Sequence, residues 1–286
     1  MAASETNSTV WNDQLLKHPH EAADKRQRVQ RMFAAIAPSY DLNNRLHSLW
    51  MDQRWRRRAV RLADLKPTDS VVDVACGTGD LTFGFYEGLL WARLHRDRAL
   101  SSPDPAQVIG IDFTYEMLPK ARGKANHIHF HGHVGSIDNF YRLADERSKR
   151  LPFINGDALA LPLPDASADV LSIAFGIRNV ADPAAAIREF YRVLRPGGRL
   201  IILEFSLPTN AIMRGLYNFY FRKVLPRTAT WISRDKTGAY RYLPESVNTF
   251  INRETMMGMM SGAGFTDVTQ HPMTFGVCVC YRGVKP

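Results

Sequence analysis

Apolar runs and helical periodicity alternate along most of the chain, which is the pattern of an α/β protein. Short runs of β-branched residues predict buried parallel strands, and apolar residues spaced three or four apart predict helices between them. The predicted strands are residues 70–74, 108–111, 151–155, 169–175 and 200–205. The predicted helices are residues 81–90, 116–125 and 183–194. This alternation predicts a mostly parallel sheet with helices on both faces.

The two ends of the chain add other elements to this pattern. Residues 25–37 predict a helix that Pro38 ends, and residues 42–50 predict a helix with one apolar face. The apolar residues of that face are Leu42, Leu46, Leu49 and Trp50. The aromatic-rich residues 211–225 follow the fifth strand and are expected to cap the cleft. The last predicted strands are residues 265–271 and 274–281, with the final strand antiparallel.

The domain organisation is simple. Residues 1–24 are polar and aperiodic, so we expect a mobile tail followed by one domain over residues 25–286. Polar segments near 91–107 and 126–150 are expected to be insertions. In the second insertion, the alternating histidines would share one side of an extended strand; they are His127, His129, His131 and His133. No carboxylate or cysteine is interleaved, so we expect a solvated loop and no metal site.

Composition excludes several classes of protein. The chain has 286 residues, of which 45% are hydrophobic and 23% charged, enough for a real core. Three cysteines are too few for a disulfide framework and indicate a reducing compartment. No apolar run reaches transmembrane length, and acidic residues near the N-terminus argue against a transit peptide. These features predict a bacterial cytoplasmic protein.

The net charge of +9 is concentrated in residues 54–61, where arginines surround Trp55. Such a segment either lies on an anionic membrane surface or forms a solvated basic face whose tryptophan packs inward. The sequence does not choose between these two. Nucleic acid is less favoured as a partner, because the chain contains no appended RNA-binding module.

The clearest chemical signal is the segment Asp73-Val74-Ala75-Cys76-Gly77-Thr78-Gly79. A strand that turns through glycines into a helix forms a ligand site at its carboxyl end. Thr82 stands where a dinucleotide fingerprint has its third glycine. The segment is similar to the first motif of class I methyltransferases, which bind S-adenosylmethionine (SAM). SAM lacks a pyrophosphate, so a close backbone approach beside a carboxylate suits its amino acid end.

Acidic residues lie at or near the ends of successive predicted strands, namely Asp73, Asp112 and Asp157. Because the carboxyl ends of parallel strands meet at one edge of a sheet, one ligand could contact all of them. Asp112, at the end of the second strand, is the expected partner of a ribose diol.

With these elements placed, the chain resembles the quinone C-methyltransferases of menaquinone and ubiquinone biosynthesis over residues 25–285. Three motifs carry the resemblance. They are Tyr40-Asp41-x-x-Asn44 with His47-x-x-Trp50, Phe175-Gly176-Ile177-Arg178-Asn179-Val180, and Arg192-Val193-Leu194-Arg195-Pro196-Gly197-Gly198-Arg199 followed by Leu203-Glu204-Phe205-Ser206. The resemblance implies a Rossmann-like class I methyltransferase fold, a mostly parallel seven-stranded sheet whose last strand is antiparallel.

The resemblance also implies SAM as the methyl donor and a set of residues that bind it. These residues are Asp73, Gly77, Thr78, Gly79, Asp112, Asp157, Ala158 and Ala174. Thr78 would contact SAM, Asp112 would hold the ribose, and Asp157 and Ala158 would flank the adenine. Ala174 stands where a serine often contacts SAM, so a backbone group would serve instead.

The implied reaction methylates a ring carbon of a polyprenylated hydroquinone. The carbon becomes nucleophilic when a ring hydroxyl loses its proton, so the enzyme needs a base and a group that stabilises the phenolate. We expect Arg178 to hold the oxyanion or orient a water, and Asn179 to hydrogen-bond a ring oxygen. Tyr40 and Asp41 would close over the ring, with Asp41 as candidate base. The alternatives are a structural turn at Tyr40 and Asp41 and a loop salt bridge at Arg178.

The favoured substrate is demethylmenaquinol, the substrate of the last step of menaquinone biosynthesis. The alternatives are 2-polyprenyl-6-methoxy-1,4-benzoquinol of ubiquinone biosynthesis, both quinols, an RNA methyltransferase, or a non-catalytic partner in a quinone-synthesis complex. A greasy substrate tail implies peripheral contact with the inner face of the cell membrane, through residues 54–61 or 211–227. Tail length, the general base and the oligomeric state, including a homodimer, stay open, and no nucleic-acid partner is expected.

Overall fold

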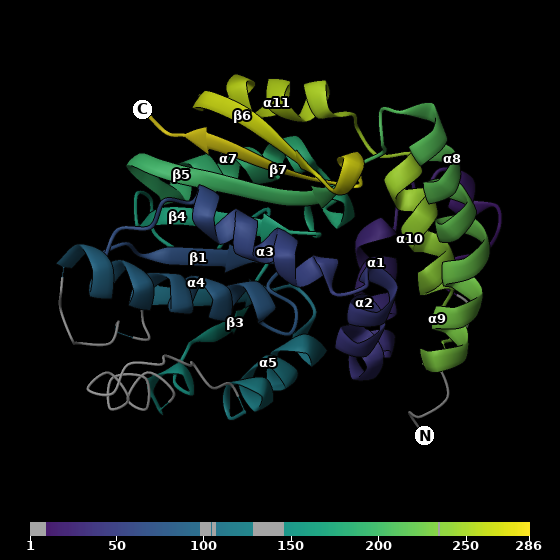
Figure 1. Ribbon diagram of the computed structural model, residues 1–286, viewed down its shortest axis with the longest axis horizontal. Coiled ribbons are helices and arrows are strands. Elements are labelled where there is room, and N and C mark those ends of the chain that lie inside the picture. The colour runs from purple at the N-terminus through teal and green to yellow at the C-terminus, as the bar shows by residue number, and fades with distance from the viewer. Residues whose placement is uncertain (1–9, 98–103, 105–106, 128–145, 234) are drawn as a thin grey trace.

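A seven-stranded sheet forms the centre of the molecule, in the order β3-β2-β1-β4-β5-β7-β6 (Figure 1). The computed structural model describes residues 10–97, 104, 107–127, 146–233 and 235–286. The strands are β1 (Val71–Val74), β2 (Val108–Asp112), β3 (Phe153–Asn155), β4 (Ala168–Ala174), β5 (Leu194–Phe205), β6 (Thr266–Met273) and β7 (Cys278–Val284). The first five pair in parallel, and β7 runs antiparallel to β5 and β6. The predicted sheet is confirmed.

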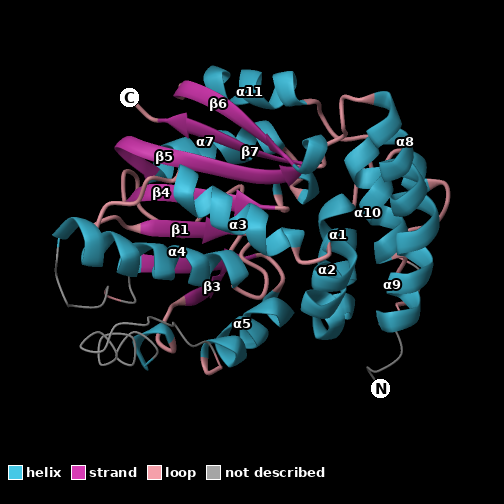
Figure 2. Cartoon of the chain, viewed as in Figure 1, coloured by secondary structure: helices cyan, strands magenta, loops and turns pink. Residues whose placement is uncertain are grey.

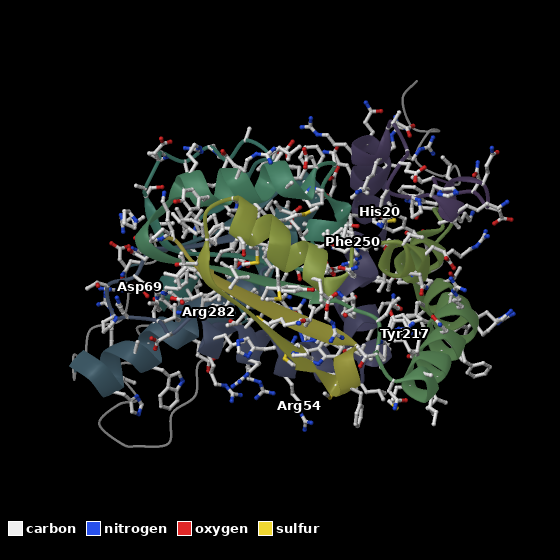
Figure 3. The ribbon with its side chains drawn as sticks, turned by 90° about the horizontal axis from the view of Figure 1, so that it is seen from above. His20, Arg54, Asp69, Tyr217, Phe250 and Arg282 are labelled. Carbon is white, nitrogen blue, oxygen red and sulfur yellow. The ribbon has the colours of Figure 1, made fainter. Side chains whose placement is uncertain are left out.

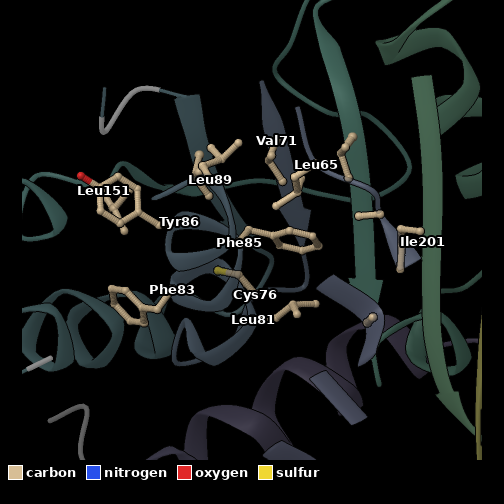
Figure 4. Close-up of a cluster of buried hydrophobic side chains, with 14 of the residues drawn as sticks. Leu65, Val71, Cys76, Leu81, Phe83, Phe85, Tyr86, Leu89, Leu151 and Ile201 are labelled. Atoms are coloured by element: carbon tan, nitrogen blue, oxygen red, sulfur yellow. The ribbon is translucent and has the colours of Figure 1, made fainter. Parts of the chain in front are cut away.

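Helices cover both faces of this sheet (Figure 2). The elements that pack on one face through a shared apolar cluster are α3 (Met51–Leu62), α4 (Asp80–Ala92) and α5 (Leu118–Ala125). Figure 4 shows Phe83, Phe85 and Tyr86 of α4 inside that cluster. The elements on the other face are α7 (Pro183–Val193) and α11 (Arg253–Gly262), which pack through a second cluster.

A further group of helices stands beyond the carboxyl ends of the parallel strands (Figure 1). They are α1 (Lys25–Ile36), α2 (Tyr40–Ser48), α8 (Ala211–Phe219), the π-helical turn η8 (Tyr220–Val224), α9 (Leu225–Ser233) and α10 (Ala239–Asn248). Residues from α1, α9 and α10 form a third apolar cluster. The aromatic-rich segment that follows the fifth strand therefore lies where the sequence placed a cap, over the end of the sheet that should hold ligand.

Packing begins earlier in the chain than the expected boundary at Lys25. Val10, Trp11 and Leu16 are buried in the third cluster, and the short helix η1 spans Leu15–Lys17. The Trp11 ring stacks on Tyr242 of α10 with 4.4 Å between ring centroids. Isolated apolar residues without a helical or strand period give no local signal of such packing.

The apolar face predicted over residues 42–50 is not a buried helical face. Helix α2 ends at Ser48, and Leu49 and Trp50 have left-handed backbone angles, with φ of 50° and 59°. Leu42, Leu46, Leu49 and Trp50 are all exposed, Leu49 by 77%. The left-handed turn at Leu49 and Trp50 redirects the chain into α3, so these two residues do not continue the helical face.

The helix expected at residues 81–90 also differs from its prediction. It continues to Ala92 and then into a π-helical turn, η3, at Arg93–Asp97. The loop expected from residue 91 therefore starts later. Its remaining part is described only at residues 104 and 107, and His129, His131 and His133 of the second insertion lie outside the described residues.

Gly110 of β2 provides a test of the packing under the site. A Cβ atom built there would lie 2.7 Å from Phe153 Cδ1 and 3.0 Å from Cys76 Sγ. We expect Gly110→Ala to lower the free energy of unfolding by about 1–3 kcal/mol, because the ring of Phe153 is held in the core. Urea unfolding measures this change. The control is Gly123→Ala in α5, where a Cβ meets nothing within 4 Å; equal effects of the two substitutions would contradict the packing.

Candidate active site

Two cavities lie at the carboxyl end of the sheet. The smaller has a volume of about 110 Å³ and borders β1, β2 and β4. Its walls include Gly77, Asp112, Asp157, Ala158 and Ala174, all expected at the SAM site. The structure therefore brings five residues from separate parts of the chain, 77 to 174, to one cavity.

The glycine turn and Asp112 hold each other in place. Gly77 N–H donates to Asp112 Oδ2 at 2.7 Å, and Thr114 N–H donates to Asp112 Oδ1 at 2.7 Å. Gly77 and Gly79 have φ of 56° and 85°, angles that a side chain rarely adopts. Burial raises the pKa of Asp112 to about 6, although the two backbone hydrogen bonds act in the opposite direction.

Asp73 lies beneath the turn and does not line the smaller cavity. Ser172 and Thr82 each donate a hydroxyl hydrogen bond of 2.7 Å to its carboxylate. Burial raises the pKa of Asp73 to about 6. In this position Asp73 fixes β1, β4 and the start of α4 against one another, so it supports the turn from below.

Thr78 and Asp41 form a separate polar group beside the turn. The Thr78 hydroxyl donates to Asp41 Oδ1 at 2.6 Å, and Lys124 Nζ lies 2.7 Å from Asp41 Oδ2. Lys124 also contacts Asp80 at 2.5 Å. Asp41, the candidate base, lines neither of these two cavities. Its carboxylate is instead held by a hydroxyl and an ammonium group.

The far wall of the smaller cavity has the character expected of an adenine site. Phe113, Met117, Ala158 and Leu159 provide apolar surface there. Asp157 pairs with Arg26 of α1 at 2.8 Å and accepts the Leu159 N–H at 3.0 Å. A fixed carboxylate for the ribose, an apolar slot for the adenine and an open glycine turn for the amino acid end fit SAM.

The larger cavity, of about 320 Å³, lies between the sheet and the capping helices. Apolar and aromatic side chains form most of its wall. Phe33, Tyr40 and Phe175 line both cavities. The two cavities therefore lie next to each other and share these aromatic side chains as a common border.

Arg178 lines the larger cavity but is firmly paired. Its Nη1 donates to Glu204 Oε1 at 2.6 Å and to the Phe175 carbonyl at 2.7 Å. Both side chains of the pair are nearly inaccessible to solvent, at 5% and 2%. Within the described part of the chain, Nη2 has no hydrogen-bond partner, which leaves it as the donor for a ligand oxygen.

Asn179 belongs to the same short helix, η7 (Ile177–Asn179), but lines the smaller cavity. Its Oδ1 accepts a hydrogen bond from Tyr242 Oη at 2.9 Å. The Lys25 ammonium group of α1 donates to the Val180 carbonyl at 2.7 Å, and burial lowers its pKa to about 8. Arg178 and Asn179, which are consecutive residues of η7, thus line the larger and the smaller cavity respectively.

Tyr40 lines both cavities. Burial raises the pKa of its phenol, so Tyr40 carries its proton at neutral pH. It can therefore donate a hydrogen bond but cannot act as a base in its resting state.

Sequence reasoning gave no role to several residues of the site. Glu204, Tyr242, His47 and Asp52 are among them. Glu204 carried a signal, because an acid in an apolar strand needs a buried partner. The only sequence signal for Tyr242 was its aromatic neighbourhood. For Asp52 the signal was the i, i+4 spacing to Arg56 on the same helix, and the two side chains pair at 2.9 Å.

No helix in the described ranges is both long enough and apolar enough to cross a membrane.

Comparison with known proteins identifies close relatives. The family model described as "ubiE/COQ5 methyltransferase family" matches residues 21–285. The demethylmenaquinone methyltransferase of Thermus thermophilus is 43% identical over 89% of this chain and 100% of its own length. The ubiquinone/menaquinone biosynthesis C-methyltransferase UbiE of Geobacter sp. (strain M21) is 39% identical over 92% of this chain and 98% of its own length.

Among solved structures, a SAM-dependent methyltransferase from Thermotoga maritima is similar with a TM-score of 0.54 and 22% sequence identity. The match covers 90% of this chain and 100% of that chain. At this identity the likeness shows the class I methyltransferase fold and no more.

The raised pKa of Asp112 predicts how SAM affinity depends on pH. A ribose hydroxyl donates a stronger hydrogen bond to an ionised carboxylate than to a protonated carboxyl group, and Asp112 gains a proton as the pH falls through about 6. We expect the dissociation constant of SAM to rise about tenfold between pH 7 and pH 5, measured by isothermal titration. Asp112→Asn should bind SAM weakly and remove most of this dependence. Constant or increasing affinity of the unmodified protein at low pH would contradict the assignment.

Proposed function

Because the chain belongs to the ubiE/COQ5 methyltransferase family, we propose that this SAM-dependent C-methyltransferase converts demethylmenaquinol to menaquinol. The observation that carries the proposal is the common border of the two cavities at Phe33, Tyr40 and Phe175. The residues that border the smaller cavity suit the ribose and adenine of SAM, and the larger, mostly apolar cavity suits a flat ring with a hydrocarbon tail. This border is where a methyl group would pass from one to the other.

SAM, when bound, supplies the methyl group on a positively charged sulfur. The chain's own residues position the ring and stabilise the charge that develops on its oxygen. We assign the oxyanion to Arg178 Nη2, which lacks another partner in the described part of the chain. Asn179 is held by Tyr242 and by its own amide nitrogen, which donates to the Phe175 carbonyl at 3.3 Å. Its second amide hydrogen would reach a ring oxygen at the border of the two cavities, and Tyr40 would donate its phenol proton toward the ring.

Asp41 takes a different role in this proposal from the one expected of it. Its contacts with Thr78 and Lys124 make it a positioning residue that holds the glycine turn. The ring hydroxyl would then lose its proton to a water molecule oriented by Arg178, and this water would pass the proton on to solvent. The proton of the methylated ring carbon would leave by the same route as the ring regains its aromaticity. This arrangement keeps the base next to the group that stabilises the resulting phenolate.

The names of the relatives support a naphthoquinol substrate without excluding a benzoquinol. Relatives from Thermus thermophilus and Deinococcus radiodurans, 43% and 40% identical, carry the name demethylmenaquinone methyltransferase. Relatives from Geobacter and Pseudomonas fluorescens, 39% and 37% identical, carry the name UbiE for both pathways. The second candidate substrate is therefore 2-polyprenyl-6-methoxy-1,4-benzoquinol.

A polyprenyl tail confines the substrate to lipid. We therefore propose that the protein works in the cytoplasm, in peripheral contact with the inner face of the cell membrane, with no nucleic-acid partner.

Methyl transfer from labelled SAM tests the substrate. We expect label in reduced demethylmenaquinone, presented in detergent, and little in the reduced methoxy-benzoquinol offered side by side. Label in both quinols would indicate an enzyme shared by the two pathways. If neither quinol is labelled while SAM binds, the proposed substrate class is wrong. Incubation with bulk RNA under the same conditions tests the RNA alternative.

Substitution of Arg178 tests its assignment as the oxyanion donor. Arg178→Lys keeps the charge opposite Glu204 but loses the second guanidinium nitrogen, so we expect kcat to fall about 100-fold with SAM affinity unchanged. The matched control is Arg199→Lys, because Arg199 pairs with the buried Asp69 and lines neither cavity. Both variants should lose similar stability in urea. Equal losses of kcat in the two variants would show that Arg178 has only a structural role.

A further inference from the structure

Large apolar side chains project into solvent from segments that border the larger cavity or adjoin its lining residues in the chain. They come from the turn between α2 and α3, from α8, and from the short helix η9 (Thr274–Gly276) that joins β6 to β7. The residues are Leu49, Trp50, Ile212, Leu216, Phe219 and Phe275, and we call them the apolar rim. Each is at least half exposed, from 56% at Trp50 to 77% at Leu49. Grouped exposed apolar residues on a soluble fold mark an interaction surface.

The backbone holds part of this rim in unfavourable conformations. Leu49, Trp50 and Phe275 have φ of 50°, 59° and 55°, in the left-handed region that bulky side chains rarely adopt. Such strain persists where the surrounding structure enforces it and is concentrated at functional sites. Here it directs three large apolar side chains away from the core.

The apolar rim is continuous with the wall of the larger cavity. Leu49 lines the cavity itself, Thr274 precedes Phe275, and Tyr220 and Phe221 follow Phe219. Figure 3 shows Arg54 of α3 and Tyr217 of α8 on the same side of the molecule, with the β6–β7 connection between them. Any apolar phase that covers the rim would therefore reach the entrance to the cavity.

A basic strip adjoins the rim along α3. Its members are exposed arginines for which the described part of the chain provides no acidic partner, namely Arg54, Arg57, Arg58 and Arg61. By contrast, Arg56 faces inward and pairs with Asp52 at 2.9 Å. Unpaired guanidinium groups beside exposed tryptophan and phenylalanine complement anionic headgroups above an acyl layer.

We propose that the apolar rim inserts into the surface of an anionic lipid layer, with the basic strip on its headgroups, so that the quinol enters the larger cavity directly from the lipid. This inference rests on the proposed function for the identity of the entering molecule. A second copy of the chain is a poorer occupant, because a symmetric contact over this face would bring two basic strips together.

Sedimentation with lipid vesicles tests the surface without any quinol. The full-length protein should bind vesicles of phosphatidylcholine with 30% phosphatidylglycerol about tenfold or more tightly than pure phosphatidylcholine vesicles. The double variant Trp50→Ser with Phe275→Ser should weaken binding to the anionic vesicles about tenfold or more. Replacing the four arginines of the basic strip with glutamine should abolish the preference for anionic lipid.

The control variant is Tyr115→Ser, in η5 (Tyr115–Met117). Its side chain is 58% exposed, similar to Trp50, but it follows β2 near the opposite edge of the sheet from η9. We expect its vesicle binding to equal that of the unmodified protein. SAM titration of every variant verifies that each is folded.

Methyl transfer separates this inference from the proposed function. The rim variant should methylate a short-tailed, water-soluble quinol at the normal rate but a long-tailed quinol in vesicles about tenfold more slowly. Absence of transfer to any quinol, with vesicle binding intact, would overturn the function and leave the lipid surface standing. Vesicle binding that the rim substitutions leave unchanged would overturn the inference. Two other results would also overturn the inference: a dimer in solution that the rim substitutions dissociate, and binding of the protein to RNA but not to vesicles.

Discussion

The buried ion pair between Arg178 and Glu204 is the interaction on which the shape of the site depends. It joins η7, after β4, to the end of β5, and Arg178 also binds the Phe175 carbonyl beside it. Phe175 in turn lines both cavities, with a left-handed φ of 57° that this hydrogen bond helps to hold. Removing one partner of such a pair typically costs about 3–5 kcal/mol, because the other charge stays buried alone. The cost of breaking the pair keeps Arg178 and Glu204 together whether or not ligand is bound.

The buried acidic residues near the smaller cavity, in contrast to Glu204, form no ion pair within the described part of the chain and oppose folding. Asp73 and Asp112 are almost fully buried, and their pKa values are raised to about 6. A buried carboxyl group with a raised pKa opposes folding at neutral pH, where it must be ionised. Hydroxyl and backbone donors reduce this cost but do not remove it. A site that lacks its ligand therefore carries unfavourable electrostatic energy, which a ligand with matching donors can relieve.

Local signals in the sequence were enough for the sheet and for the residues around the smaller cavity. Each strand is an apolar run, which makes it recognisable in the sequence. Asp112 and Asp157 lie at or just after the carboxyl ends of parallel strands, and these ends share one edge of the sheet, so the two residues could be placed together. Long-range pairings had no such signal. Glu204 pairs across 26 positions and Asp41 across 37, and neither partner is implied by spacing. The exposure of Leu49 and Trp50 stayed open for another reason, since a helical period predicts a shared face but not what covers it.

The packing of the N-terminal segment on α10 has a consequence for the order in which the protein can be built. His20 Nε2 binds the Ser246 carbonyl across 226 positions, and Trp11 stacks on Tyr242, which orients Asn179. At ribosomal speeds of roughly 5–20 residues per second, these first residues wait about 10–45 s for their partners to be synthesised. During translation the parallel strands β1 to β5 can pair before α10 is made, while the catalytic end remains open. The enzyme therefore acquires its active site only when almost all of the chain has left the ribosome.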